Sequence, residues 1–478
     1  MIAIRRGWFH LASGAGVGRV LGFVSNLLLS RWLGPAELGL FNLVTTTVQT
    51  SDTLVRCGAD YALNFELGGQ TEASKSENGV ELVRGLAQIC SLVTAFICMG
   101  VSIWVWWGQG LFPRAFVTSQ RLILTGLLLL MIACEGISAS AWEVLLVSHR
   151  TAQLALRQGL FFPLRLFSAG VGALSSGVLG AMMGWSLVAF VQCIWLKIVL
   201  RYLWNPFQMW PPLWSSVHQL LKRGFPFYVA NLLASMIFYP LLLQVATGSG
   251  LSEIGYLRVG QVLQQLFAFL PATLVPVLFL RLRSESSYAD QVLVIEKPLR
   301  VIWLLLVQVL LLYCIVDHSL IIWLFGTQFI SALIPTRLLL IISLFECLAQ
   351  LVVQPLLAAG RTRFYGFWQN GAALLAAILG WLWIPTAGLA AYLIVRLLYV
   401  VVPLIAFGAP VVRHLHEPGK LLSLAFATIV LLASSLAQAL FGLDSAWMPS
   451  FYLAAFMAIV ILNRQDLSFI RRMLTGIT

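Results

Sequence analysis

Charged residues are scarce in this chain, and long polar segments are absent. Only 10% of its 478 residues are charged and 60% are hydrophobic, against about 25% and about 45–50% in soluble domains. No water-soluble fold can bury so large an apolar share. The sequence also lacks a Walker motif, an HExxH motif and a nucleophile elbow. These absences argue against a soluble enzyme, an ATP-driven pump and a membrane hydrolase.

The cysteines and histidines show no pattern for metal binding or disulfide bonds. All seven cysteines lie in apolar stretches, and none forms a CxxC pair. The pair His414-x-His416 has no companion ligands nearby and is predicted to lie in a solvated loop. We therefore expect no metal site and no cofactor.

Apolar runs of spanning length repeat along the whole chain, each close to the about 20 residues that a helix needs to cross a bilayer. Broken by charges or Gly/Pro, they fall at roughly 8–30, 39–64, 82–107, 121–147, 153–176, 178–203, 221–246, 254–280, 299–317, 330–356, 364–383, 386–408, 420–441 and 446–463. Short turns at Ser175-Ser176-Gly177 and at Pro385 separate two of the pairs. The sequence predicts an all-α integral membrane protein of about 14 transmembrane helices.

The charge balance of 30 Lys+Arg against 18 Asp+Glu gives a net charge of +12. In a soluble protein this would suggest nucleic-acid binding, but membrane proteins concentrate Lys and Arg in their inner loops. With the N-terminus inside, the outer segments hold only Arg31, Arg114 and Arg121, and the other loop cations lie inside. We expect both termini to be cytoplasmic and no nucleic-acid partner.

A weak internal repeat relates two parts of the chain. Arg6-Gly7-Trp8-Phe9 is followed by Glu37-Leu38-Gly39-Leu40, and Arg223-Gly224-Phe225-Pro226 is followed by Glu253-Ile254-Gly255-Tyr256. The offset spans six predicted helices, an even number, so both copies face the same way. The pattern predicts two parallel six-helix bundles around a central cavity, residues 1–216 and 217–410, followed by two C-terminal helices and a cytoplasmic tail in 411–478.

Charged side chains inside the predicted spans are costly, at about 2.5–3.5 kcal/mol each on insertion scales. They are Arg19, Arg56, Arg165, Arg258, Arg337, Arg396, Asp52, Asp60, Glu135, Glu143 and Glu346. We expect them to face a hydrated interior or one another. Arg337 lies near the predicted outer end of its helix and is expected to snorkel.

Four-residue spacing places several of these groups on single helix faces. Asp52, Arg56, Asp60 and Asn64 form one stripe, which either neutralises Arg56 for helix packing or presents it for transport. Arg19, Asn26 and Ser30 form a second stripe, and Arg258, Gln261 and Gln265 a third. All three are predicted to face inward.

Four of the arginines lack an acid nearby in the sequence, namely Arg19, Arg165, Arg258 and Arg396. They suggest an anionic substrate, because the guanidinium stays ionised and donates two parallel hydrogen bonds to phosphate. Glu135 and Glu143 lie two turns apart on one helix. They either titrate as an ion-coupling site or pair with arginines across the cavity.

Small residues at four-residue spacing form two ladders, Gly14, Gly18 and Gly22, and Gly172, Ser176, Gly180 and Gly184. Such ladders allow close helix packing, which is the role we expect here.

The segment Arg31-Trp32-Leu33-Gly34-Pro35-Ala36-Glu37-Leu38-Gly39-Leu40-Phe41-Asn42 resembles the first-loop signature of polysaccharide-biosynthesis flippases, of the O-antigen and exopolysaccharide type, in the multidrug/oligosaccharidyl-lipid/polysaccharide exporter superfamily. Gly58, Arg223-Gly224-Phe225-Pro226 and Glu253-Ile254-Gly255-Tyr256 are further matches. The resemblance covers the whole chain in helix number and repeat.

That resemblance implies a flippase that moves a polyprenyl-diphosphate-linked oligosaccharide across a bacterial inner membrane by alternating access. The glycan would serve lipopolysaccharide or exopolysaccharide biosynthesis, with membrane lipids and glycan polymerase machinery as partners. It implies that Arg19, Arg56 and Arg258 line the lumen near the lipid diphosphate; Arg165, Arg396 and Asn26 complete the predicted cavity set. Asp60, Glu135 and Glu143 are the candidates for coupling to a proton or sodium gradient.

Three alternatives remain beside this hypothesis. A lipid II flippase of the same superfamily shares every feature above. A multidrug cation antiporter would need acids to capture its substrate, and the helices after the twelfth and the inward arginines weigh against it. A membrane glycan polymerase or ligase, an enzyme, would need a large outer loop, and the predicted outer loops are short. We therefore expect a transporter without covalent chemistry.

Overall fold

The computed structural model describes residues 2–56, 78–107, 118–147, 151–200, 214–268 and 287–416, together with short pieces in 274–285 and 419–459. Every regular element among them is helical. Five helices are long and apolar enough to cross a membrane: Thr118–Ala139, Ala152–Val199, Tyr288–Phe325, Thr327–Ala358 and Arg363–Val412. The chain is a multi-pass membrane protein. Its predicted total of about 14 helices stays a prediction.

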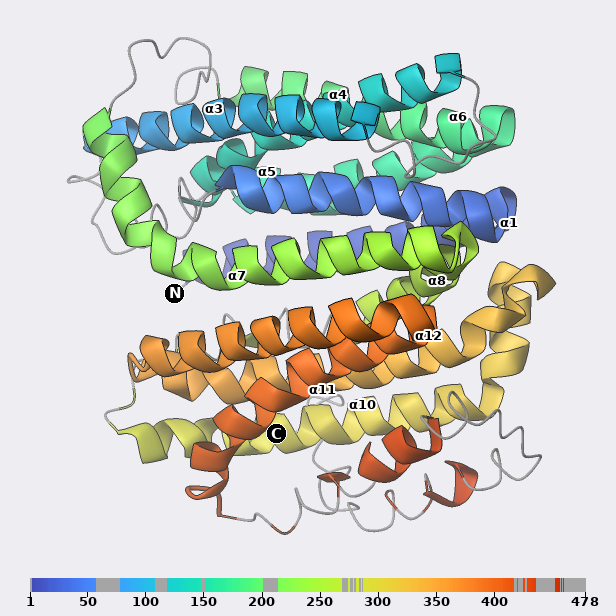
Figure 1. Cartoon of the computed structure of the whole chain (residues 1–478). Coiled ribbons are helices and arrows are strands. Elements are labelled where there is room, and N and C mark those ends of the chain that lie inside the picture. Colours follow the sequence, from blue (N-terminus) through green and yellow to red (C-terminus); the bar gives the residue numbers. More distant parts are fainter. Residues whose placement is uncertain are drawn as a thin grey trace. The chain divides into compact units, whose positions relative to one another are not determined.

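Figure 1 shows the described helices in their order along the chain. Their bounds are α1 Ile2–Arg56, α3 Asn78–Trp107, α4 Thr118–Val147, α5 Thr151–Leu156, α6 Phe162–Val199, α7 Trp214–Gly248, α8 Leu251–Phe267, α10 Tyr288–Phe325, α11 Leu333–Ala358 and α12 Thr362–Val412. A π-helical turn, Arg157–Phe161, joins α5 to α6, and a 3₁₀ turn, Thr327–Ala332, joins α10 to α11.

Three of these helices each contain two of the predicted spans, separated by a glycine with positive φ. The breaks lie at Gly34 in α1, at Ser176-Gly177 in α6 and at Gly388 in α12. The predicted turn at Ser175-Ser176-Gly177 is confirmed. The predicted turn at Pro385 is wrong by three residues, because Pro385 keeps helical geometry while Gly388 adopts a φ of 54° that an L side chain disfavours.

The glycine ladder of α6 packs the two arms of this helix against each other. A Cβ on Gly172 would lie 2.0 Å from the Gly180 carbonyl oxygen, and a Cβ on Gly184 would lie 2.2 Å from that of Ser168. The Ser168 hydroxyl donates to the Gly184 carbonyl at 2.8 Å across the same contact. The packing role expected for this ladder is confirmed.

By backbone contacts the chain divides into two compact units, residues 1–255 and 256–478. In the first, α6 packs on α1 and α4, and α3 packs on α4 and α7. Its core includes Val55, Leu86, Trp142 and Leu196. This grouping does not test the predicted repeat boundaries at 216 and 410, which stay predictions.

In the second unit α11 is the central helix, because it packs on both α10 and α12. In the span Thr327–Ala358, which contains α11, 83% of the most apolar stretch is buried inside the protein, against 44% in the span of α12. Large apolar side chains on the outer helices of both units face outward instead, such as Phe96, Trp323 and Trp381 at 77%, 71% and 66% exposure. Such a surface suits lipid as the solvent.

Two glycines of the predicted repeat make matching contacts. A Cβ on Gly39 would lie 1.8 Å from the Leu251 carbonyl oxygen, and a Cβ on Gly255 would lie 2.0 Å from the Pro35 carbonyl oxygen. Leu251 follows Pro35 by 216 residues, and Gly255 follows Gly39 by the same 216. Equivalent positions of the two copies therefore pack reciprocally, and only glycine allows the backbones so close.

Candidate functional site

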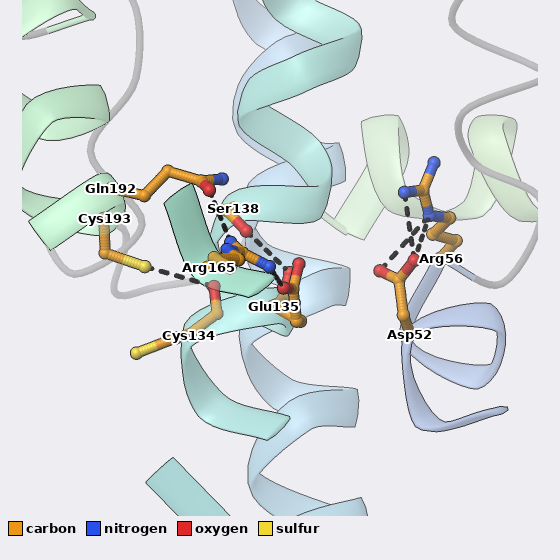
Figure 2. A network of polar contacts seen from close by, with 8 residues as sticks. All are labelled: Asp52, Arg56, Cys134, Glu135, Ser138, Arg165, Gln192 and Cys193. Carbon is orange, nitrogen blue, oxygen red and sulfur yellow. Dashed lines mark hydrogen bonds and ion pairs between the residues drawn. The ribbon is translucent and has the colours of Figure 1, made fainter. Parts of the chain in front are cut away.

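Arg165, in the first arm of α6, is the centre of a buried polar cluster in the first unit (Figure 2). Its guanidinium forms an ion pair with Glu135 of α4 and donates a hydrogen bond to the Gln192 side-chain oxygen from the second arm of α6. Arg165 is only 6% exposed. Burying this charge is costly unless a carboxylate neutralises it, and Glu135 does so.

Two cysteines and a serine extend this cluster. The Cys193 thiol donates to the Cys134 carbonyl at 3.1 Å, and the Ser138 hydroxyl donates to the Glu135 carbonyl at 3.1 Å. The Cys193–Cys134 contact joins the end of α6 to the middle of α4, whereas the Ser138–Glu135 contact lies within α4 (Figure 2). Six cysteines among the described residues are free thiols.

Arg56 and Asp52 form a second ion pair, at the end of α1. The Arg56 Nη2 lies 3.0 Å from Asp52 Oδ2, and its Nε donates to the same carboxylate. Both side chains are about a quarter exposed, at 23% and 25%. Arg56 thus pairs with Asp52, as one of the two alternatives for this stripe has it, and Asp60 lies outside the described residues.

Asn26 and Arg19 lie along the first arm of α1. Asn26 is 1% exposed and donates its amide to the Gly22 carbonyl at 2.8 Å, while Ser30 donates to the Asn26 carbonyl at 2.7 Å. Both hydrogen bonds are made to backbone carbonyls of the same helix, so these polar side chains are satisfied inside an apolar helix. Arg19 is half-buried on the same arm.

In the second unit a carboxylate receives two donors. Arg396 of α12 lies 3.0 Å from Glu346 Oε1, and Gln264 of α8 donates to Glu346 Oε2 at 2.9 Å. Arg258, on α8 as well, is 8% exposed. Glu346 of α11 is thus neutralised by Arg396 of α12, and α8 contributes both Gln264 and the buried Arg258.

Arg165 and Arg396 lack an acid nearby in the sequence, as predicted, but each pairs with one in the structure. Their acids, Glu135 and Glu346, lie 30 and 50 residues away on other helices. Glu135 thus pairs with an arginine, which is one of the two alternatives left open for it. Arg337 does not snorkel either, because it pairs with Asp317 of α10 and its side chain is 13% exposed. Three of the five predicted cavity arginines, Arg56, Arg165 and Arg396, are paired with carboxylates.

Sequence reasoning missed Gln192, Gln264 and Asp317. Gln192 is a single polar residue in an apolar run, whereas Gln264 is next to Gln265 and Asp317 is next to His318. Gln192 contacts Arg165, Gln264 contacts Glu346 and Asp317 pairs with Arg337. The signal was present, because a polar side chain in a membrane helix needs a partner. For Glu143, the backbone lies within α4 and the side chain falls outside the described part.

The arrangement suits binding and conformational change. The charges sit on helices as ion pairs whose partners come from different segments, one buried and one partly exposed. A ligand or a proton that competes for one partner would change how those helices pack. The roles predicted for the site residues stay predictions.

No family model matches the sequence, and no curated protein matches it. Solved structures do match. The lipid II flippase MurJ in an inward closed conformation aligns with a TM-score of 0.72 and 11% identity, over 97% of this chain and 99% of MurJ. A MOP superfamily transporter from Pyrococcus furiosus aligns at 0.59 with 15% identity, over 85% of this chain and 95% of that one.

An outward-facing multidrug resistance MATE transporter of the same superfamily aligns at 0.56 with 14% identity, over 90% of this chain and 96% of the transporter. At such identities the likeness shows the fold alone. The chain therefore shares the multi-helix membrane fold of these transporters.

Proposed function

We propose that this chain is a flippase that moves polyprenyl-diphosphate-linked oligosaccharide across a bacterial inner membrane for polysaccharide biosynthesis or export. The polar headgroup would cross through a hydrated cavity while the lipid tail stays in the membrane. Alternating access of two helix bundles supplies the motion. No covalent step is needed, and lipopolysaccharide and exopolysaccharide precursors are the cargo class.

The observation that carries the proposal is the burial of Arg258 in α8, at 8% exposure. A membrane helix holds such a charge only where function or pairing repays about 2.5–3.5 kcal/mol. A guanidinium is the group that binds the oxygens of a diphosphate in two parallel hydrogen bonds. The fold shared with a lipid II flippase over nearly the whole chain supports the same cargo class.

We assign Arg19 and Arg258 to the diphosphate, because the family resemblance implies that arginines of these two helices line the lumen near it. Arg56, Arg165 and Arg396 hold the cavity wall through their carboxylate partners, and Asn26 lies on the same helix as Arg19. Asp60, Glu135 and Glu143 are our candidates for ion coupling. Protonation of Glu135 would release Arg165 from its ion pair, which gives a gradient a way to act on α4 and α6.

The test replaces Arg19 or Arg258 with Ala in the native host. We expect each change to abolish glycan export while protein levels stay normal. Arg31→Ala is the control, because Arg31 is an exposed arginine in the loop signature, at the end of the first predicted span, and should not affect export. Wild-type export in Arg19→Ala and Arg258→Ala would refute the cavity assignment.

A lipid II flippase is the second candidate, favoured by the alignment with MurJ over 97% of the chain. Both cargoes carry the same diphosphate, so the arginines do not separate them. Rescue of cells depleted of their own lipid II flippase would favour this candidate. Adjacent glycosyltransferase genes, with no rescue, would favour polysaccharide export.

A further inference from the structure

Two neighbouring cavities open in the second unit between α11 and the two arms of α12. The first, of about 590 Å³, is lined by Leu356, Gly360, Arg361, Arg363, Phe364, Ala406, Ala409, Pro410 and Arg413. The second, of about 260 Å³, is lined by Glu346, Ala349, Gln350, Val353, Tyr365, Gln369, Tyr399, Val400, Pro403 and Phe407. Neither contains a residue of the predicted cavity set.

The first cavity is strongly cationic. Among its described lining residues are three arginines and no carboxylate. The Arg361 guanidinium stands 4.8 Å from the Tyr288 ring centre, a cation–π contact that orients this side chain. All three arginines are in segments that the charge pattern predicts to be cytoplasmic. Basic pockets between membrane helices on that side bind phosphate-bearing lipid headgroups.

The second cavity is aromatic and polar without net charge. Tyr365 and Phe407 stack with ring centres 5.6 Å apart, and Gln369 donates to the Tyr399 hydroxyl. The one lining acid, Glu346, is neutralised by Arg396. Aromatic faces with a few convergent amides and hydroxyls are typical of sites for small polar ligands, and about 260 Å³ suits a single sugar ring rather than an oligosaccharide.

Phe407 connects the two cavities. It lines the second, and its ring lies 6.2 Å from that of Phe364, which lines the first. A ligand with an anionic group next to a sugar would place each part in the cavity that suits it. The order of the cavities, with the arginines at the predicted inner end, matches a headgroup that enters from the inner leaflet.

We propose that the two cavities form one loading site for a lipid-linked sugar phosphate. The arginines Arg361, Arg363 and Arg413 bind the phosphates, and Gln350, Gln369 and the Tyr365–Phe407 stack bind the first sugar. This inference rests on the proposed function and adds a second site to it, on the second unit alone. The site captures the headgroup before translocation.

The test measures binding to the full chain in neutral-lipid nanodiscs with three probes: farnesyl diphosphate, farnesyl-diphosphate-linked N-acetylglucosamine, and phosphatidylglycerol. The triple variant Arg361→Gln, Arg363→Gln, Arg413→Gln should weaken binding of both diphosphates at least tenfold. Lys222→Gln, which removes an exposed cation of α7 outside both cavities, should leave binding unchanged.

The sugar assignment has its own readout. In the wild type the N-acetylglucosamine probe should bind at least fivefold more tightly than farnesyl diphosphate. Gln369→Ala should abolish that gain without weakening farnesyl diphosphate. Unchanged diphosphate binding in the triple variant would overturn the phosphate assignment, and no gain from the sugar would overturn the sugar assignment. Phosphatidylglycerol that binds as tightly as the glycan probe would make the first cavity an ordinary lipid site, which also overturns the proposal.

A flipping assay separates this inference from the proposed function. If the triple variant flips lipid-linked glycan at the wild-type rate while Arg258→Ala does not, the loading site is wrong and the flippase stands. If the wild type flips no lipid-linked glycan, the proposed function is wrong whatever the binding results.

Discussion

Arg165 is held inside the first unit by one carboxylate and one amide, both from segments distant in sequence. Removal of Glu135 alone would leave a guanidinium at 6% exposure without its counter-charge. We expect Glu135→Ala to lower the free energy of unfolding by about 3–5 kcal/mol. Replacing both partners by apolar residues, Glu135→Leu with Arg165→Met, should cost much less, because no buried charge remains. Thermal unfolding in detergent measures both.

Asp52→Ala is the matched control for that experiment. Its pair with Arg56 is about a quarter exposed, and such pairs contribute about 0–1 kcal/mol. If Glu135→Ala is no less stable than Asp52→Ala, then the Arg165–Glu135 pair does not hold α4 to α6.

The same residues show what a sequence can predict about charges. Asp52 and Arg56 are neighbours one turn apart, so spacing alone predicts their pairing. Glu135 with Arg165 and Glu346 with Arg396 meet only through tertiary packing. A sequence shows that each of these groups needs a partner and does not show which helix supplies it. For this reason the acids of Arg165 and Arg396, 30 and 50 residues away, do not follow from the sequence.

Helical segments in this protein pack closely at glycines, so adding a methyl group at these glycines should separate the segments. Gly39→Ala and Gly255→Ala would each push a Cβ into a backbone carbonyl, at 1.8 Å and 2.0 Å. Because a carbonyl cannot move aside as a flexible side chain can, the two segments must separate. We expect each variant to lose transport and to unfold at lower temperature than the wild type.

Gly126→Ala is the control within a helix. A Cβ there meets no atom within 4 Å, so alanine should be neutral or stabilise α4 by up to about 1 kcal/mol. Equal stability of Gly39→Ala and Gly126→Ala would contradict the close contact.

Elements were predictable where composition and turn residues mark them. The hairpin at Ser176-Gly177 follows from a small-residue turn between two apolar runs, and the ladder of Gly172, Gly180 and Gly184 follows from spacing. The turn in α12 was misplaced because Pro385 is a strong turn signal, whereas the chain bends at Gly388. Composition does not reveal that the α11–α12 region contains two cavities, since side chains from separate segments form them.

At the scale of the whole molecule, the fold of MOP superfamily transporters and the reciprocal contacts of Gly39 and Gly255 support an internal repeat. Parallel repeats of this kind occur in secondary transporters that work by alternating access. The cargo is the part that neither fold nor repeat specifies, so it must be measured directly.

The most direct measurement is flipping in proteoliposomes that contain the purified chain and a fluorescent polyprenyl-diphosphate-linked oligosaccharide, with a membrane-impermeant quencher outside. The account predicts that wild-type protein carries the fluorescent lipid from the inner leaflet, where the quencher cannot reach it, to the outer leaflet, where it is quenched. Arg258→Ala should flip no faster than vesicles without protein. No flipping of the lipid-linked glycan by folded wild-type protein, with transport of a cationic drug in its place, would contradict it.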